Sequence, residues 1–321
     1  SQFSEIEVKN LISQASEKEL VIECSRMLQE NFFHYADLIT DKLLKINPES
    51  ANYKYRKGFI ELTMRQDYLK AIELFTAASG SIDKNYDMYS VKEGAVPADV
   101  FYHLGRAHHL NEDFAKAIEN YNLFLAQTSK ESELIEHTEK RIHQCGIAKK
   151  LMAMPKDVNV ENLGDSINTE YADFSSNISL DGRALYFTSR RPWEDGASNG
   201  FKDPMLNHYS EDIYQASLAD NDGWNSPSRM DMCKPQFNEA SVSVSIDERR
   251  VYTYNDKKGN GDIYYSDLKN GSFTPIAPIG KSGINTETRW ETHYTVSPDG
   301  KMVFFVSDKE SGYGKRDIYY L

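Results

Sequence analysis

The chain has 321 residues, a mass of 36.7 kDa and a formal charge of −12 at pH 7. This acidic balance argues against nucleic-acid binding, because proteins that bind nucleic acids carry a basic face, and no run of about 18 apolar residues is present to form a membrane-spanning helix. Residues 1–150 hold 5 of the 18 glycines and 2 of the 10 prolines. A helix-rich half is therefore expected to precede a half made of strands and turns.

Three copies of one pattern occupy the first half. The clearest copy has Leu104 and Gly105, then a turn, then Ala117 and Tyr121. A second copy uses Gly58, Ala71 and Phe75, and a weaker first copy uses Cys24, Phe33 and Ala36. Small residues at fixed offsets let the two helices of a hairpin cross closely, and the large residues fill the space beside them.

This spacing resembles that of tetratricopeptide (TPR) repeats. It predicts an all-α solenoid over residues 1–153, with about three repeats, an additional loop near Gly80–Pro97 and a capping helix over 132–153. Gly58 and Gly105 are expected to be structural residues of the repeat, placed at helix crossings.

The first helix of each TPR hairpin lines a concave groove, and the register predicts which side chains face it. Arginine and tyrosine are favoured anchors of protein partners, and Arg106 in particular can hold a carboxylate. The alternative is that the groove-facing residues are ordinary packing or solvated side chains. The predicted partner-binding residues of the groove are Asn52, Tyr55, Phe59, Tyr102, Arg106 and His109.

Three units with a common order of signals occupy the second half. Each has an S-x-D turn, then a run of aromatic and β-branched residues, then an Asp-Ile-Tyr triplet that begins at Asp212, Asp262 or Asp317. Such runs are typical of strands, and the triplets lie 50 and 55 residues apart, close to the length of a four-stranded propeller blade. Because these aspartates recur in every unit, we expect them to make turn or interblade hydrogen bonds rather than to act as catalytic acids.

The motifs of this half resemble the PD40 (TolB-like, WD40-like) propeller repeat. Together with the TPR-like first half and the I-N-T-E and W-E-T-H segments at Ile284–Glu287 and Trp290–His293, they resemble envelope proteins of Bacteroidota that end in an OmpA-like domain, among them PorE-like components of type IX secretion. The resemblance implies an α+β multidomain chain, in which an all-α TPR solenoid is followed by an all-β PD40 propeller at 154–321.

The same resemblance implies a function and a compartment. It implies a non-catalytic scaffold, periplasmic and associated with the outer membrane, that binds protein partners of type IX secretion, gliding or cell-wall anchoring. Peptidoglycan is expected to be bound only through a domain that this sequence does not contain. The chain starts at Ser1 without an apolar signal core, so any export signal or lipid anchor is expected to have been removed or never to have existed.

Three blade units, the last without an outer strand, make an incomplete propeller, because closed propellers have about four to eight blades. We expect either that the natural protein continues beyond Leu321 or that another chain completes the ring, and we favour continuation. The first unit carries an insertion, Pro192–Tyr209, that the other two lack. Its aromatic residues Trp193, Phe201 and Tyr209 are predicted to contact partners, or alternatively to fold back over their own blade.

Catalytic, cofactor and metal signals are weak. Residues 280–282 end like a P-loop but lack its first glycine, residues 220–223 are acidic but lack an EF-hand ligand pattern, and Cys24, Cys145 and Cys233 form no metal-ligand spacing and are expected to be buried. No enzyme, cofactor or metal is therefore expected. Two alternatives stay open: a propeller that gates a peptidase domain outside this sequence, and a propeller that binds glycan or calcium.

Overall fold

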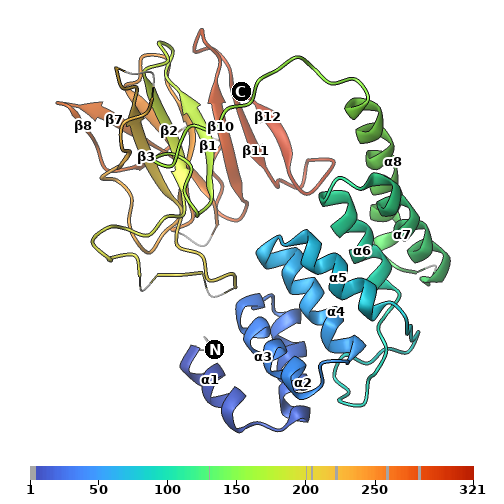
Figure 1. Cartoon of the computed structure of the whole chain (residues 1–321). Coiled ribbons are helices and arrows are strands. Elements are labelled where there is room, and N and C mark those ends of the chain that lie inside the picture. The colour runs from blue at the N-terminus through green and yellow to red at the C-terminus, as the bar shows by residue number, and fades with distance from the viewer. Residues whose placement is uncertain are drawn as a thin grey trace. The chain divides into compact units, whose positions relative to one another are not determined.

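The structure, a computed structural model, describes residues 5–129, 131–199, 201–203, 205–220, 223–257, 260–280 and 283–321. It divides into two compact units, with the main boundary between Val158 and Asn159. The first unit is built from helices and the second from strands (Figure 1). In the described part of the chain, no helix combines the length and the apolar character that crossing a membrane requires.

The helical unit is a series of antiparallel hairpins, α2 with α3, α4 with α5 and α6 with α7, and α8 packs against α7. A short π-helical turn, η1, ends the helix α4. This is the predicted TPR-type solenoid with its capping helix. The elements are α1 (Glu5–Gln14), α2 (Glu17–Gln29), α3 (Phe33–Ile46), α4 (Ala51–Ile60), η1 (Glu61–Arg65), α5 (Tyr68–Ala78), α6 (Asp99–Leu110), α7 (Phe114–Gln127) and α8 (Leu134–Met152).

One residue in each hairpin turn has a left-handed backbone. These residues are Asn31, Gln66 and Glu112, with φ values of 63°, 56° and 62°, and each stands two positions before the aromatic residue that begins the second helix. Their spacings, 35 residues from 31 to 66 and 46 from 66 to 112, equal those of the alanines in the sequence pattern. The extra residues of the third copy lie between α5 and α6.

The small residues of the pattern lie where helices cross. A Cβ added to Gly58 would come within 2.9 Å of the Phe75 ring, and one added to Gly105 would come within 2.5 Å of the Tyr121 ring. Both contacts join the first helix of a hairpin to the second. Glycine is required at both positions because no side chain fits between the helices.

The second unit consists of antiparallel sheets with consecutive strands side by side, as in propeller blades. The first blade has the order β1-β2-β3-β4, the second β5-β6-β7-β8 with β9 also on β7, and the third β10-β11-β12. The strands are β1 (Asp173–Ile178), β2 (Ala184–Ser189), β3 (Asp212–Ser217), β4 (Ser228–Arg229), β5 (Glu239–Val244), β6 (Arg250–Asn255), β7 (Asp262–Lys269), β8 (Ser272–Phe273), β9 (Ala277–Pro278), β10 (Glu291–Val296), β11 (Val303–Ser307) and β12 (Asp317–Tyr320).

The S-x-D motifs close the first hairpin of each blade. In each motif the serine hydroxyl donates to the aspartate Oδ1, at 2.7 Å in Ser179–Asp181 and Ser245–Asp247 and at 2.6 Å in Ser297–Asp299. The next residue is left-handed in all three, at Gly182, Glu248 and Gly300. The motif therefore sets the turn by local hydrogen bonds, which is why it recurs with each blade.

Apolar side chains fill the spaces between neighbouring blades. Tyr186, Ile213 and Val251 belong to the core between the first and second blades, and Ile263 and Phe305 to the core between the second and third. The opposite face of the third blade carries exposed apolar residues, with Ile318 75% and Tyr320 70% exposed. The predicted fold class, an all-α repeat array followed by propeller-type blades, is thus correct.

Candidate functional site

Three of the predicted groove residues, Tyr102, Arg106 and His109, form one cluster on α6. The Tyr102 ring is buried and packs against Tyr121 and Phe124, with centroid distances of 6.1 and 5.6 Å. The Arg106 guanidinium carbon lies 6.0 Å from the centre of the Tyr102 ring. The cluster thus places a cation against an aromatic surface, an arrangement that is typical of binding anchors.

A second arginine joins this cluster from the capping helix. Arg141 of α8 lies with its guanidinium carbon 6.0 Å from the centre of the same Tyr102 ring, and its Nε donates to the Tyr102 hydroxyl at 3.3 Å. Sequence reasoning missed Arg141, because no repeat position links α8 to α6. We call Tyr102, Arg106, His109 and Arg141 the arginine site.

Arg106 has no acidic partner among the residues that the structure describes. Its Nε is buried and makes no hydrogen bond. Burial lowers the pKa of the Arg106 guanidinium from its usual value, and the nearby positive charge of Arg141 lowers it further. A half-buried cation that lacks a counterion is stabilised by any carboxylate that reaches it.

His109 completes the arginine site at the end of α6. Its Nδ1 is 3.5 Å from the Tyr121 hydroxyl, and its ring lies edge-on to Phe114 at 5.7 Å. Burial and the charge of Arg141 both lower the pKa of His109. The neutral imidazole therefore adds an apolar and hydrogen-bonding surface to the arginine site, and the charge comes from the two arginines.

Asn52 lies elsewhere, beneath the segment between α5 and α6 (residues 79–98), which we call the α5–α6 loop. It is fully buried, its Oδ1 accepts from the Tyr86 hydroxyl at 2.7 Å, and its Nδ2 donates to the Glu93 carbonyl at 3.4 Å. Asn52 therefore binds a segment of its own chain, and the structure does not bring it together with Arg106.

Tyr55 and Phe59 belong to a ring cluster around His103. Their centroids lie 6.1 and 5.1 Å from that of the imidazole, and Phe75 stacks on it at 5.9 Å. Burial, with the charge of Arg106, lowers the pKa of His103 to about 3. These two predicted groove residues thus join the second repeat to the third by packing.

Arg56 is the residue that fixes the α5–α6 loop, and the pattern did not single it out. It is 1% exposed, and it donates to Asn52 Oδ1 at 3.1 Å, to Ser25 Oγ at 3.0 Å and to the Met88 carbonyl. Ser25 also donates to the Met88 carbonyl. The loop backbone therefore occupies the faces of α2 and α4 that Arg56 and Ser25 present.

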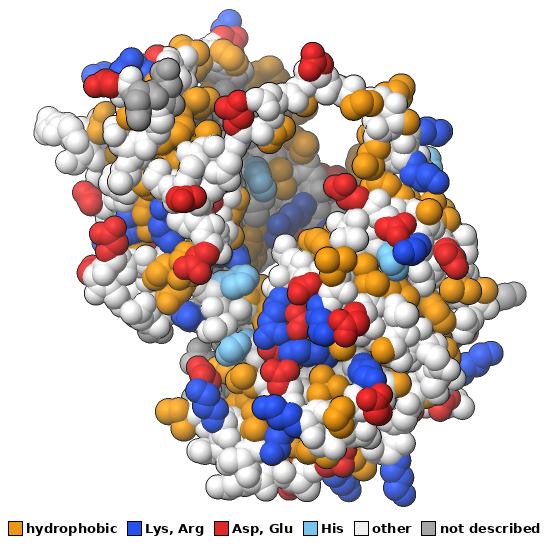
Figure 2. Space-filling model, viewed as in Figure 1, with side chains coloured by type: hydrophobic (Ala, Val, Ile, Leu, Met, Phe, Trp, Pro, Cys, Tyr) orange, Lys and Arg blue, Asp and Glu red, His pale blue; other side chains and the backbone are white. Residues whose placement is uncertain are grey.

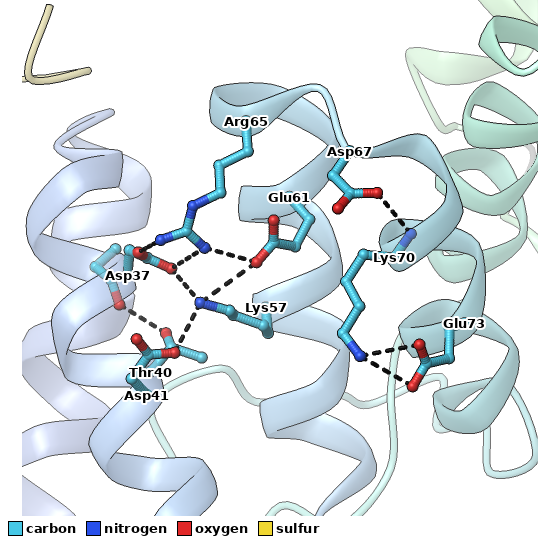
Figure 3. Close-up of polar contacts among 10 residues, drawn as sticks. Asp37, Thr40, Asp41, Lys57, Glu61, Arg65, Asp67, Lys70 and Glu73 are labelled. Atoms are coloured by element: carbon cyan, nitrogen blue, oxygen red, sulfur yellow. Dashed lines mark hydrogen bonds and ion pairs between the residues drawn. The ribbon is translucent and has the colours of Figure 1, made fainter.

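A network of ion pairs connects α3 to α4 and η1 (Figure 3). The Lys57 ammonium is 2.6 Å from Asp37 and 2.7 Å from Asp41, and Arg65 pairs with Asp37 and, at 2.6 Å, with Glu61. Burial alone would lower the pKa of Lys57, but the hydrogen bonds of Asp37 and Asp41 raise it above its usual value. In Figure 2 the helical unit shows basic and acidic side chains clustered together rather than a patch of one charge. Unlike Arg106, these cations are neutralised within the chain.

The blade-1 insertion is folded back at its start and exposed further on. The Trp193 Nε1 donates to Asp212 Oδ2 at 2.7 Å, and the Arg229 guanidinium stacks on the Trp193 ring. Phe201 is 46% exposed, and the Lys202 ammonium lies 4.3 Å from the centre of the Tyr209 ring. Trp193 thus serves its own blade, whereas Phe201 is accessible for a partner.

The Asp-Ile-Tyr aspartates differ in environment from blade to blade. Asp212 and Asp262 are buried, whereas Asp317 is half-buried and accepts from the Gly314 amide at 3.0 Å in a local turn.

Two of the weak sequence signals lie partly outside the described residues. The P-loop-like end includes Lys281 and Ser282, and the acidic loop includes Asn221 and Asp222.

No family model matches the chain, and no curated protein matches its sequence. Solved structures with partial similarity fall into two groups. TolB from Acinetobacter baumannii is 20% identical with a TM-score of 0.29, over 46% of this chain and 29% of that protein. The TPR domain of Arabidopsis OM64 is 15% identical with a TM-score of 0.31, over 40% of this chain and 94% of that domain.

A third neighbour is the Yersinia enterocolitica type III secretion chaperone SycD, whose structure contains a peptide of the translocator YopD. It is 15% identical with a TM-score of 0.32, over 46% of this chain and 99% of that chaperone. The chain spans less than a third of the length of the TolB structure named above.

Proposed function

We propose that the protein is a non-catalytic adaptor whose arginine site binds a carboxylate of a partner protein, either an acidic side chain or a free C-terminus. The observation that carries this proposal is the pair Arg106 and Arg141, which share the Tyr102 ring and have no acidic partner in the described part of the chain. Planar guanidinium groups bind carboxylates with two parallel hydrogen bonds, and the rings beside them offer apolar contact.

Binding of labelled peptides tests this proposal. Short acidic peptides with a free C-terminus, the same peptides with an amidated C-terminus, and lysine-rich peptides of equal length are titrated into the full chain, and fluorescence anisotropy is measured. Preference for both acidic forms indicates a side-chain carboxylate, and preference for the free form alone indicates a C-terminus. Equal affinity for acidic and lysine-rich peptides would show that the arginine site is not a carboxylate site.

We further infer that this adaptor works on the periplasmic side of the outer membrane, in type IX secretion, gliding or cell-wall attachment. The support is the order of TPR-type and PD40-like repeats in the sequence. Cell fractionation and cross-linking test it, with a photo-reactive residue at the exposed Phe201 of the blade-1 insertion. Recovery of the protein only from the cytoplasmic fraction contradicts it.

A further inference from the structure

Asp212, Cys233 and Glu239 form a buried cluster where the first blade packs on the second. They come from β3, from the segment that follows β4 and from the first residue of β5. One possible ligand atom of each residue lies within 4.8 Å of those of the other two. All three are at most 1% exposed. A thiol and two carboxyl groups are thus concentrated in an interior that disfavours like charges.

We call the interface of the first and second blades the first junction and that of the second and third blades the second junction. The second junction is built in the same way but has no thiol. Lys234 N donates to Glu239 at 3.2 Å in the first junction, and Thr286 N donates to Glu291 at 3.1 Å in the second. Cys233 therefore stands where the second junction has Asn285.

Asn285 makes hydrogen bonds with both backbone groups of Ile263 on the neighbouring strand. Its Oδ1 accepts from Ile263 N at 2.9 Å, and its Nδ2 donates to Ile263 O at 2.7 Å. Cys233 Sγ lies at the corresponding place, 3.2 Å from Ile213 N and 3.9 Å from Ile213 O. The amide therefore makes shorter hydrogen bonds to the strand than the thiol does, so backbone hydrogen bonding does not explain why the first junction has cysteine, although Cys233 also packs in the core between the two blades.

Outer hydrogen-bond donors hold the two carboxyl groups of the cluster in place. Trp193 Nε1 donates to Asp212 Oδ2 at 2.7 Å, and Asn255 Nδ2 donates to Glu239 Oε1 at 2.7 Å. Asp212 Oδ1, by contrast, is buried and has no hydrogen-bond partner. An outer donor thus fixes one oxygen of Asp212 and leaves the other free, as is characteristic of a carboxylate that binds metal, whereas Glu239 accepts at both oxygens, at Oε2 from Lys234 N at 3.2 Å.

We propose that Asp212, Cys233 and Glu239 bind one divalent ion of the zinc class at the junction of the first two blades. Zinc binds cysteine sulfur at about 2.3 Å and carboxylate oxygen at about 2.0–2.2 Å, so small side-chain movements bring these three groups onto one ion. The thiol, and each carboxyl group that is protonated in the metal-free cluster, loses its proton to solvent when the metal binds. Glu239 and Asn255 also line a pocket of about 620 Å³, through which an ion can reach the cluster.

Without a cation, the cluster must retain protons. Burial raises the pKa of Asp212 to about 6 and that of Glu239 to about 8, and it raises the pKa of the Cys233 thiol as well. Arg229, which is stacked on Trp193, forms no ion pair with the cluster in the described part of the chain, although its charge partly opposes the rise in the pKa of Asp212 and of Cys233. The competing explanation is therefore a protonated, metal-free cluster, which the experiment distinguishes.

The test measures metal content and thiolate coordination in the full chain. The protein is treated with chelator, incubated with Zn²⁺ or Co²⁺, and dialysed. We expect one retained ion per chain by elemental analysis, and a thiolate-to-cobalt charge-transfer band with Co²⁺. Cys145→Ala, which removes another buried thiol, is expected to retain both.

Cys233→Asn is the decisive variant, because the second junction shows that asparagine fits there. It is expected to fold, as judged by circular dichroism, and to lose both the ion and the charge-transfer band. Trp193→Phe is expected to weaken zinc affinity about 10–100-fold through loss of the outer donor. Absence of stoichiometric metal in the wild type, or equal retention by Cys233→Asn, overturns the proposal.

Discussion

The guanidinium carbons of Arg106 and Arg141 lie at the same distance, 6.0 Å, from the centre of the Tyr102 ring. One arginine belongs to the third hairpin and the other to the capping helix, so the arginine site exists only when α8 packs against that hairpin. Removal of either arginine should weaken the binding of acidic peptides, while the Tyr102 ring stays in place.

Arg106→Gln and Arg141→Gln are each expected to lower the affinity for acidic peptides about 10–100-fold, because hydrogen bonds to charged groups contribute about 1.5–3 kcal/mol. Peptide titration measures the change. Lys116→Gln is the control, since Lys116 is an exposed cation that pairs with Asp113 at 3.2 Å. A loss of similar size in Lys116→Gln would indicate attraction by overall charge.

Arg56 and Arg106 are expected to respond in opposite ways to loss of charge. Arg56→Met removes a buried guanidinium that donates to the Met88 carbonyl, to Asn52 Oδ1 and to Ser25 Oγ, and it should lower the free energy of unfolding by about 3 kcal/mol or more. Arg106→Met removes a half-buried cation without a partner and should leave stability unchanged or raise it. Urea denaturation measures both. Equal destabilisation would mean that Arg106 has a structural partner.

Gly105→Ala is expected to lower the free energy of unfolding by about 1–3 kcal/mol, because the new Cβ would approach the Tyr121 ring to 2.5 Å. Gly146→Ala on α8 is the matched control. No atom lies within 4 Å of its added Cβ, and alanine in a helix interior should stabilise by about 0.5–1 kcal/mol. Thermal denaturation of the two variants should therefore shift in opposite directions.

His103 should make the helical unit less stable in acid. Its pKa is about 3 in the folded chain, below the usual 6.5, so the unfolded state binds the proton more readily. The contribution of the neutral His103 to the free energy of unfolding is complete above about pH 6.5. It decreases as the pH falls towards 3, by at most about 1.4 kcal/mol per pH unit.

His103→Phe removes this titration, and the buried Nδ1 has no hydrogen bond to lose. Urea denaturation between pH 4 and pH 7 should give a smaller pH dependence for the variant than for the wild type. An unchanged slope would show that other groups cause the acid sensitivity.

The outer face of the third blade should promote self-association. Ile318 and Tyr320 on β12 are 75% and 70% exposed, beside Phe304 on β11. Apolar patches next to an unpaired strand edge favour contact between molecules. We expect light scattering of the full chain to rise with concentration, and the double variant Ile318→Asp, Tyr320→Asp to suppress it with little change in melting temperature. A wild-type chain that stays monomeric at high concentration contradicts this.

The sequence by itself determined the repeat architecture. The offsets among Gly58, Gly105 and their aromatic partners predicted the helix crossings, and the S-x-D motifs predicted the blade hairpins. These features are readable because each depends on residues that are close in the chain, or on steric limits that recur in every repeat.

Only the tertiary structure decided what the candidate site residues contact. The α5–α6 loop lies over Asn52 because Arg56 and Ser25 bind its Met88 carbonyl. Likewise Arg141 reaches Tyr102, and Cys233 reaches Asp212, across 39 and 21 residues of chain. No repeat position predicts the contacts of Arg56 and Arg141, and the repeat positions of Asp212 and Cys233 do not by themselves show that the two side chains meet. They follow from the packing of whole helices and blades, and that packing is set by the summed burial of many side chains rather than by any local pattern.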